Sequence, residues 1–465
     1  MEYVSTRGGA PALGFEDVLL SGLARDGGLF VPANWPAIAP EEIAALGGMD
    51  YAGIAARIVR PFIGNDTLDD DALLQLAQAT YAGFEHPDVA PLRQIDDDTW
   101  LLELFHGPTL AFKDFALQLL GRLFEHVLAR RGARITIVGA TSGDTGSAAI
   151  EACRGRANLD IFMLHPEGRV SEVQRRQMTT VVVDNVFNLA VGGTFDDCQD
   201  LVKALFADHA LRDELSLSAV NSINWARVMG QTAYYFSAAA RLGAVGEELT
   251  FVVPTGNFGN VYSAYVARQM GLPISRLVVA SNRNDILYRF YTDGDMSIAG
   301  VEPSLSPSMD IQVSSNFERL MFDLMDRDGA AVAAAMQAFR NEGSLPGAAA
   351  LRDGARTLFE GQRVDDDETL EVIRDVHETS GVLLDPHTAV GVGAARKSAR
   401  DGRKRIVLAT AHPAKFPDAV ESATGVRPAP PPHLADLLDR PEVATSIANE
   451  VGAVRDFVRG HAAAT

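Results

Sequence analysis

The sequence predicts an α/β protein with two parallel-sheet domains and an additional N-terminal accessory domain. Three observations favour this fold class. From about Pro91 onward, short apolar runs typical of buried strands alternate with helical patterns of roughly ten to twenty residues. Several of these runs end in glycine-rich turns that open a helix, as in parallel α/β units. A length of 465 residues also exceeds what one simple core needs, so we expect two or three domains.

The accessory domain is expected to cover residues 1–90. Residues 22–32, GLARDGGLFVP, are typical of a helix end, a glycine turn and a short strand. Helical patterns punctuated by proline and glycine continue to about Phe84, and we identify no phosphate loop or catalytic cluster in them. The domain is predicted to end near residues 86–88.

The strands that follow divide between two α/β domains. We predict the smaller domain over residues 131–221, with strands at 134–139, 159–164 and 186–191 and helices from Ser147, from about Val170 and around 201–206. The larger domain is predicted to combine residues 91–130 with 222–426, with strands at 249–253, 277–280 and 406–409 and a helix from Val261. The segment RPAPPP at 427–432 predicts a stiff connector to a short helical tail within 427–465.

Composition argues against several functional classes. The net charge of −20 and the pI of about 4.9 argue against a nucleic-acid partner and against an anionic membrane surface. The two cysteines, Cys153 and Cys198, are too few for a disulfide framework and fit a reducing compartment. No targeting segment follows Met1 and no apolar run is long enough to cross a bilayer, so we expect a cytoplasmic protein.

Residues 104–115, LFHGPTLAFKDF, place one lysine among apolar and aromatic neighbours. Burial should disfavour the charged form of Lys113, lower its pKa and make the neutral amine available. A neutral amine attacks aldehydes, which is how an enzyme lysine holds pyridoxal phosphate as a Schiff base. The alternative is an amphipathic helix that starts near Asp114, with the lysine charge kept in water. This segment alone favours the alternative.

Three strand ends carry polar residues suited to ligands. The first is TGNFGN, residues 255–260, where backbone N–H groups at a helix start favour a phosphate. Its glycines allow a ligand to approach closely, and its two asparagines can donate hydrogen bonds. The turn lacks the Gly-Lys-Ser/Thr of a Walker loop and the full dinucleotide pattern. An ordinary βα turn is an equally good interpretation of these residues alone.

The second strand end is ATSGDTG, residues 140–146, whose hydroxyls and amides can cradle a carboxylate or a phosphate or can simply cap the helix. The third is LATAHPAKF, residues 408–416. Thr410 could reach a cofactor ring nitrogen there. His412 and Lys415 offer titratable groups at the same rim, although a single histidine or lysine in a loop is more often merely solvated.

Taken together, these segments resemble the threonine synthase family, pyridoxal-phosphate enzymes of the tryptophan-synthase-β type (fold type II). The likeness extends from about Tyr3 to Phe416 and is carried by LFHGPTLAFKDF, ATSGDTG, NSINWARVMGQ at 221–231, PTGNFGN at 254–260 and TAHPAKF at 410–416. Residues 22–32 are also similar to the opening domain of the longer form of the family. Several motifs in the right order are far more specific than any one of them.

The resemblance implies a role for each motif residue. The residues that would hold pyridoxal 5'-phosphate are Lys113 through the internal aldimine, Gly256, Asn257, Phe258, Gly259 and Asn260 at its phosphate, and Thr410 at its pyridine nitrogen. The residues that would bind substrate are Ser142, Gly143, Asp144 and Thr145 at its carboxylate, and Asn224 and Arg227, with Ser222 nearby, at its phosphate. Many fold-type-II relatives have asparagine where Asp144 stands, so this position departs from the wider pattern. No metal is implied.

The implied activity is that of a carbon–oxygen lyase acting on phosphates. It converts O-phospho-L-homoserine and water to L-threonine and phosphate by β,γ-elimination and replacement, the last step of threonine biosynthesis, with Lys113 moving protons at Cα and Cβ. The alternative is a phospho-lyase on the same scaffold that releases a 2-oxoacid. A non-catalytic sensor of a phosphorylated amino acid and a nicotinamide dehydrogenase fit less well, the latter because no complete G-x-G-x-x-G follows a first strand. We expect a small-molecule substrate, no nucleic-acid or membrane partner, and a monomer or homodimer.

Overall fold

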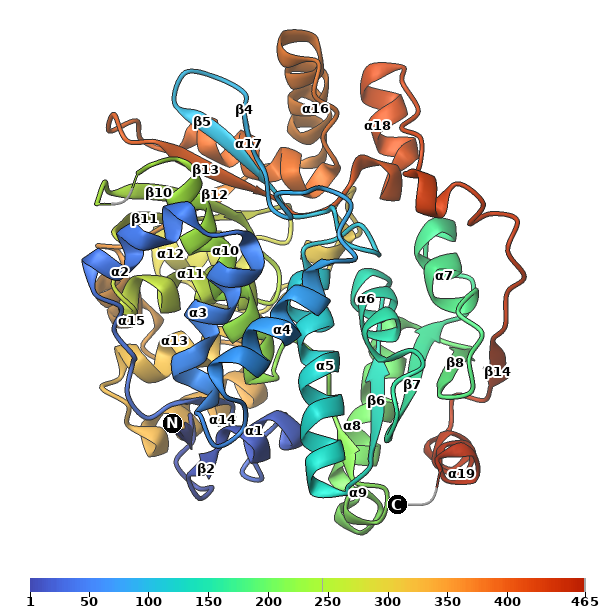
Figure 1. The fold of residues 1–465 in the computed structure, drawn as a ribbon. Coiled ribbons are helices and arrows are strands. Elements are labelled where there is room, and N and C mark those ends of the chain that lie inside the picture. The colour runs from blue at the N-terminus through green and yellow to red at the C-terminus, as the bar shows by residue number, and fades with distance from the viewer. Residues whose placement is uncertain (245, 464–465) are drawn as a thin grey trace.

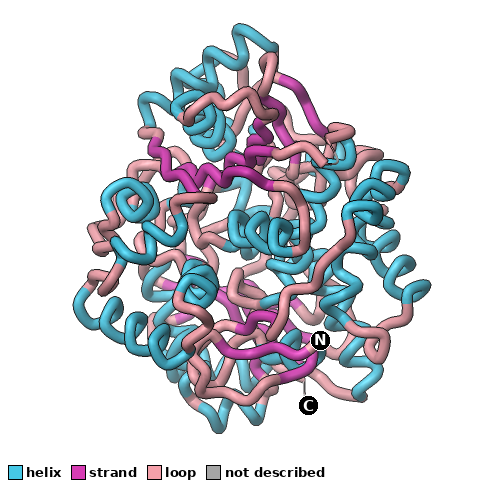
Figure 2. Tube along the Cα trace, turned by 90° about the vertical axis from the view of Figure 1, so that its left-hand side faces the viewer, coloured by secondary structure: helices cyan, strands magenta, loops and turns pink. Residues whose placement is uncertain are grey.

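Two parallel β-sheets form the centre of the molecule, and a small antiparallel sheet lies near the N-terminus. The computed structural model describes residues 1–244 and 246–463. The central strands of both parallel sheets lie between layers of helices, and β4 and β14 lie at the outer edges (Figures 1 and 2). The expected α/β class with two parallel sheets and an N-terminal addition is therefore confirmed.

The larger sheet has the strand order β12-β11-β10-β13-β5-β4, in which only the β4–β5 pair is antiparallel. Its strands are Leu92–Gln94 (β4), Thr99–Glu103 (β5), Leu249–Pro254 (β10), Ile274–Ser281 (β11), Phe359–Arg363 (β12) and Arg405–Ala409 (β13). β10 and β13 are buried along their whole length, as expected for strands covered by helices on both faces. The strands predicted at 249–253, 277–280 and 406–409 are confirmed, and the sequence prediction omits β4, β5 and β12.

The smaller sheet is entirely parallel and has the order β14-β8-β7-β6-β9. Its strands are Ile135–Ala140 (β6), Leu159–Pro166 (β7), Val186–Val191 (β8), Leu217–Ser218 (β9) and Thr445–Ile447 (β14). The three predicted strands are confirmed. β14 comes from the C-terminal segment, so the end of the chain returns to this sheet. The boundaries proposed for the individual domains stay a prediction.

The N-terminal sheet joins Glu2–Ser5 (β1), Leu13–Gly14 (β2) and Phe30–Pro32 (β3) in the order β2-β1-β3. It packs on helix α10 (Trp225–Arg241), where the Trp225 ring lies 6.0 Å from that of Tyr3 and 5.6 Å from that of Phe62. The accessory segment thus supports the helix that carries Arg227.

The helices mostly begin earlier than the sequence predicts, because short polar side chains cap them. α6 starts at Asp144 and not at Ser147, and α8 starts at Phe195, directly after a capping box made by Thr194 and Asp197. The remaining helices and 3-10 turns are α1 (Phe15–Ser21), α2 (Pro40–Ala45), η1 (Leu46–Gly48), α3 (Tyr51–Ile63), α4 (Asp70–Tyr81), α5 (Lys113–Arg131), α6 to Cys153, α7 (Glu172–Thr179), α8 to Ala207, α9 (His209–Glu214), α11 (Gly259–Gln269), α12 (Ile286–Asp293), η2 (Pro307–Met309), α13 (Phe317–Leu324), α14 (Gly329–Glu342), α15 (Ala348–Ala355), α16 (Asp366–Ser380), α17 (Pro386–Lys397), η3 (Pro413–Lys415), α18 (Pro417–Thr424), η4 (Pro432–Leu434) and α19 (Val451–His461).

The C-terminal strap, residues 427–450, leaves α18 and runs along the outside of α7 and β8 to the helical tail α19 (Figure 1). Glu442 in the strap forms an ion pair with Arg175 of α7 at 2.6 Å, and the Val443 N–H donates to the Thr179 carbonyl at 2.7 Å. The predicted connector and helical tail are therefore present, and the connector also fixes α7.

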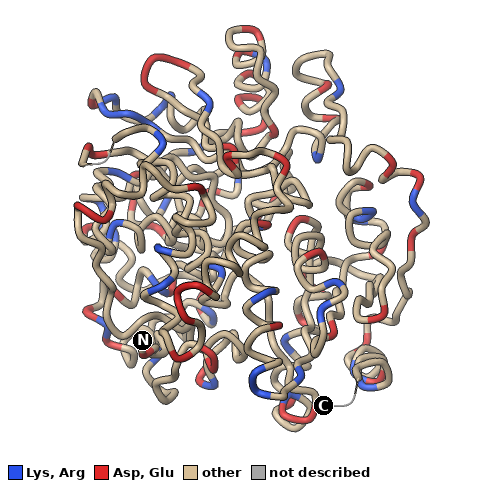
Figure 3. The backbone as a smooth tube through the Cα atoms, in the orientation of Figure 1, with Lys and Arg blue, Asp and Glu red and all other residues tan. Residues whose placement is uncertain are grey.

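Acidic and basic residues are interspersed over the outer parts of the molecule (Figure 3). Across residues 1–244 and 246–463, no helix combines the length and apolar character needed to cross a bilayer.

Candidate active site

One cavity collects side chains from the carboxyl ends of strands in both parallel sheets, where ligands of α/β proteins bind. Its lining residues are Phe112, Lys113, Asp144, Thr145, Ser222, Arg227, Gln231, residues 254–260, Ser308, Met309, His387, Thr410 and Ala411. Most of the predicted site residues are therefore brought together. The three that do not line the cavity are Ser142, Gly143 and Asn224.

Lys113 is the first residue of α5, and backbone pairing fixes it beside Thr410. Ala111 and Ala411 form an isolated antiparallel bridge, and the Phe112 N–H donates to the Thr410 carbonyl at 2.9 Å. The loop before α5 is therefore bonded to the loop after β13. This pairing brings two motifs that are far apart in the sequence to the same wall of the cavity.

Lys113 is only 8% exposed, and its Nζ lies 3.2 Å from Asp144 Oδ2. Burial lowers the pKa of Lys113. The Asp144 carboxylate opposes this effect, while the positive charges of Lys415 and Arg227 add to it. The predicted burial of Lys113 is confirmed, and the interpretation that leaves its ammonium in water does not hold.

The buried Asp144 carboxylate accepts hydrogen bonds from several side chains. Its Oδ1 accepts from Gln174 Nε2 at 2.8 Å and pairs with Lys415 Nζ at 2.9 Å, while Ser308 Oγ donates to Oδ2 at 3.2 Å. Burial alone would raise the pKa of Asp144, but Lys113 and Lys415 hold it well below its usual range. Asp144 is therefore ionised and serves as counter-ion to two lysines.

Asn260 offers an unused donor at the turn that follows β10. The Tyr234 hydroxyl hydrogen-bonds to Asn260 Oδ1, and the Tyr235 hydroxyl donates to the same oxygen at 2.8 Å. With that oxygen occupied, the amide nitrogen Nδ2 is buried and has no partner among the described residues. A buried donor without an acceptor is costly, so the turn is built to receive an acceptor-rich group.

The backbone of the same turn is shaped for an anion. Phe258 has the left-handed φ of 63° and directly precedes α11, whose first N–H groups lack helical partners. A Cβ on Gly256 would lie 2.5 Å from the Ser308 carbonyl oxygen, so only glycine lets the segment carrying Ser308 close over the turn. Free amides and the helix dipole together favour a phosphate here.

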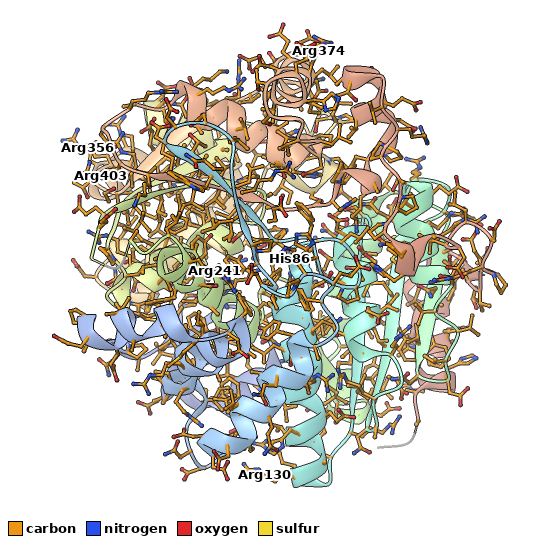
Figure 4. All side chains as sticks on the ribbon, turned by 45° about the horizontal axis from the view of Figure 1, so that its top comes forward. His86, Arg130, Arg241, Arg356, Arg374 and Arg403 are labelled. Atoms are coloured by element: carbon orange, nitrogen blue, oxygen red, sulfur yellow. The ribbon has the colours of Figure 1, made fainter. Side chains whose placement is uncertain are left out.

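Arg227 provides a second, separate site for negative charge. Its side chain is 3% exposed, and within the described residues no carboxylate forms an ion pair with it. Its Nη1 donates to the Val220 carbonyl at 3.4 Å, and its buried Nε has no partner in residues 1–244 and 246–463. Burial lowers the pKa of Arg227 to about 10, so it stays charged at neutral pH. Arg356 and Arg403, by contrast, point outward at the edge of the molecule (Figure 4), with side chains 71% and 38% exposed.

The loop at 140–146 presents Thr145 to the cavity and turns Ser142 outward. Thr141 Oγ1 accepts the N–H groups of Gly143 at 2.9 Å and Gly146 at 2.8 Å, so these amides are already satisfied. Gly143 packs against α7, where an added Cβ would lie 2.5 Å from a Gln174 side-chain atom. Ser142 is exposed. The loop can therefore offer a ligand the Thr145 hydroxyl and the N–H groups of Asp144 and Thr145, the first two residues of α6.

Asn224 is occupied elsewhere, which differs from its expected place at the substrate phosphate. It is fully buried, its Oδ1 accepts the Ala226 N–H at 3.1 Å, and its Nδ2 donates to the carbonyls of Leu19 at 3.0 Å and Ala219 at 3.2 Å. These bonds cap α10 and tie it to the N-terminal segment. In this structure Asn224 caps α10, and Arg227 in the first turn of that helix lines the cavity. Ser222 lines the cavity as well.

A buried histidine that sequence reasoning missed also lines the cavity. His387 Nδ1 lies 2.9 Å from Asp385 Oδ1, and its Nε2 accepts the Ser308 N–H at 3.2 Å. The only sequence feature that could have indicated it is the segment DPHT at 385–388, which looks like an ordinary helix cap. His412, which the sequence did flag, caps η3 through a bond from the Ala414 N–H, and burial lowers its pKa to about 4.

Family models cover most of the chain. Residues 2–81 match the threonine synthase N terminus, residues 87–352 match the pyridoxal-phosphate dependent enzyme family, and residues 388–458 match the threonine synthase C-terminal family.

Known proteins match along the full length. The threonine synthase of Pseudomonas aeruginosa is 56% identical over 463 residues, which cover 99% of this chain and 98% of the relative. That of Corynebacterium glutamicum is 42% identical over 472 residues, or 98% of both chains. A PLP-bound threonine synthase from Brucella melitensis superposes with a TM-score of 0.96 at 52% identity and 99% coverage of both chains. The yeast enzyme superposes with a TM-score of 0.92 at 39% identity, covering 99% of this chain and 98% of the other.

Proposed function

The chain belongs to the threonine synthase family, and from that premise we propose how its cavity converts O-phospho-L-homoserine and water to L-threonine and phosphate. One observation carries the proposal. A single cavity combines a buried lysine with two separate anion-binding groups, the turn at Asn260 and the unpaired Arg227. A phosphorylated cofactor and a phosphorylated substrate require two such groups.

Pyridoxal phosphate fits the residues present. The free Nδ2 of Asn260 and the amides of residues 256–260 would hold its phosphate, Lys113 would hold its aldehyde carbon, and Thr410 would meet its ring nitrogen. When bound, the cofactor supplies an electron sink for negative charge that develops on the substrate carbons.

The chain's own groups bind the substrate and move its protons. Arg227 has a planar fork that suits the substrate phosphate and gains charge-assisted bonds that the protein does not supply. The Thr145 hydroxyl and the N–H groups of the first two residues of α6 are suited to the substrate carboxylate. Burial lowers the pKa of the Lys113 amine, which favours its neutral form and suits it to take and return protons at Cα and then at Cβ.

A product assay on O-phospho-L-homoserine tests the function. We expect threonine and inorganic phosphate in equal amounts, with little 2-oxobutyrate. A predominance of 2-oxobutyrate would identify a phospho-lyase on the same scaffold, and absence of turnover in the cofactor-loaded protein would favour a sensor. Lys113→Ala, which removes the amine, is the matched blank once circular dichroism shows that it is folded.

We also propose that the enzyme works in the cytoplasm as a monomer or homodimer. Cys153 and Cys198 are free and buried, which supports a reducing compartment. Light scattering of the purified protein would determine the number of subunits.

A further inference from the structure

A second buried lysine lies behind Lys113. Lys415 is 1% exposed, and its Nζ lies 2.9 Å from Asp144 Oδ1. It also donates to the Thr109 carbonyl at 2.8 Å and to Gln177 Oε1 at 2.9 Å. An ammonium has three donors, and three acceptors surround this one. Lys415 is not among the residues that line the cavity, so it is placed to act on Asp144 and not on a ligand.

Asp144 is shared between the two lysines, one on each carboxylate oxygen. The other charged or titratable groups that face this cluster come from three helices. Arg227 of α10 faces Lys113, His387 of α17 faces Asp144, and Asp114 of α5 faces Lys415. With both lysines protonated, the Lys113–Asp144–Lys415 cluster carries one net positive charge. When Lys113 is neutral, the cluster carries none.

The net charge of the cluster matters because Lys113 must alternate between its charged and neutral forms. If Lys113 were the only partner of Asp144, loss of its proton would leave a buried carboxylate without a counter-charge, which is strongly unfavourable. Lys113 would then be held in its charged, non-nucleophilic form. With Lys415 in place, Asp144 keeps a buried cation throughout.

We propose that Lys415 is a positioning residue that permanently neutralises Asp144, so that Lys113 can lose its proton inside the protein. The proposal rests on the proposed function in that Lys113 is taken as the lysine that captures the cofactor. It assigns Lys415 a role that needs no contact with substrate or cofactor.

The test measures how fast the cofactor-free, full-length chain captures added pyridoxal phosphate as a function of pH. Borohydride trapping and peptide mapping then identify the lysine that carries it. Lys415→Met should move the profile at least about one pH unit higher, which means about tenfold slower capture at neutral pH. Asp144→Asn should move it lower, because Lys113 then faces only positive charge. The double variant should lie between the two single variants.

Lys203→Met is the control, because Lys203 is exposed and its ion-pair partner is the surface residue Asp200. Its profile should coincide with that of the wild type. A Lys415→Met profile that coincides with the wild type, or a double variant shifted as far upward as the single one, would overturn the proposal. If circular dichroism shows that Lys415→Met does not fold, Asp144→Asn still decides, since an upward or absent shift contradicts it. Cofactor trapped on another lysine would instead refute the assignment of Lys113.

Discussion

Arg227→Met should raise the free energy of unfolding and strongly lower kcat/KM. Arg227 is buried with no carboxylate partner in the described part of the chain, and burial lowers its pKa from its usual value to about 10. That difference corresponds to about 3 kcal/mol of unfavourable charging free energy. The folded-state pKa is depressed, so this cost is complete below pH 10 and disappears at higher pH, where the unfolded chain also loses its proton. Methionine fills a similar space without charge, so the free energy of unfolding should rise by up to about 3 kcal/mol.

Catalysis should change in the opposite direction. Removing one charged partner of a buried phosphate costs about 2–5 kcal/mol, which corresponds to a loss of roughly 30- to 5,000-fold in kcat/KM. The loss should fall mainly on KM, because Arg227 is expected to bind the substrate and not the cofactor. Cofactor content and absorbance should stay almost normal.

Urea unfolding and steady-state kinetics measure both effects on the same preparations. Inorganic phosphate should stabilise the wild type and have little effect on Arg227→Met. Arg356→Met is the control, since that arginine lies at the surface and should change neither quantity. A variant that is less stable and retains its KM would refute the reasoning. A variant that purifies without cofactor would show that the two phosphate sites are exchanged.

The remaining predictions concern the cofactor lysine, the ring-nitrogen residue and a buried acid. Lys113→Ala should abolish turnover and covalent cofactor attachment, and reduced wild-type protein should carry the cofactor on the Lys113 peptide; a label on Lys203 or Lys415 would contradict this. Thr410→Asp should slow threonine formation and increase the share of transaminated cofactor after many turnovers, because a carboxylate would keep the ring nitrogen protonated; unchanged partitioning with cofactor bound would mean that Thr410 does not face the ring. Burial raises the pKa of Asp114 from 3.8 to about 6, so its contribution to stability is complete below pH 3.8 and is lost as the pH rises through 6. The free energy of unfolding of Asp114→Asn, measured in urea, should therefore rise relative to that of the wild type by about 3 kcal/mol as the pH increases from 3.8 to 6. A difference between the two proteins that does not change with pH would refute the raised pKa of Asp114.

The central strands could be predicted because their composition reflects burial on both faces. β6 (ITIVGA) and β10 (LTFVVP) are continuous apolar runs. β12 (FEGQR) lies at the edge of the larger sheet and contains a glycine and polar residues, so its sequence carries no such signal. β14 (TSI) is too short and too exposed to be recognised without its partner β8.

The candidate site was predictable where a motif is local. The turn around Asn260 and the apolar setting of Lys113 are each contained in one short segment. The hydroxyls that orient Asn260 come from Tyr235, 25 residues away, and its neighbour Tyr234. Lys415 reaches the Thr109 carbonyl across a separation of 306 residues. Such contacts depend on how the sheets come together, and a residue pattern along the chain does not contain them.

The strap also sets the order in which the molecule can be completed during synthesis. β8 ends at Val191, and its outer neighbour β14 begins at Thr445, which is 254 residues later. At roughly 5–20 residues per second, a ribosome needs about 13–50 s to make that stretch. During this interval β8 has an open edge with unpaired backbone groups, the kind of surface that other chains can join. Glu442, which pairs with Arg175 of α7, emerges only at the end of the same interval. The edge of β8 is therefore covered, and α7 fixed by Glu442, only after the other strands of both parallel sheets have been made.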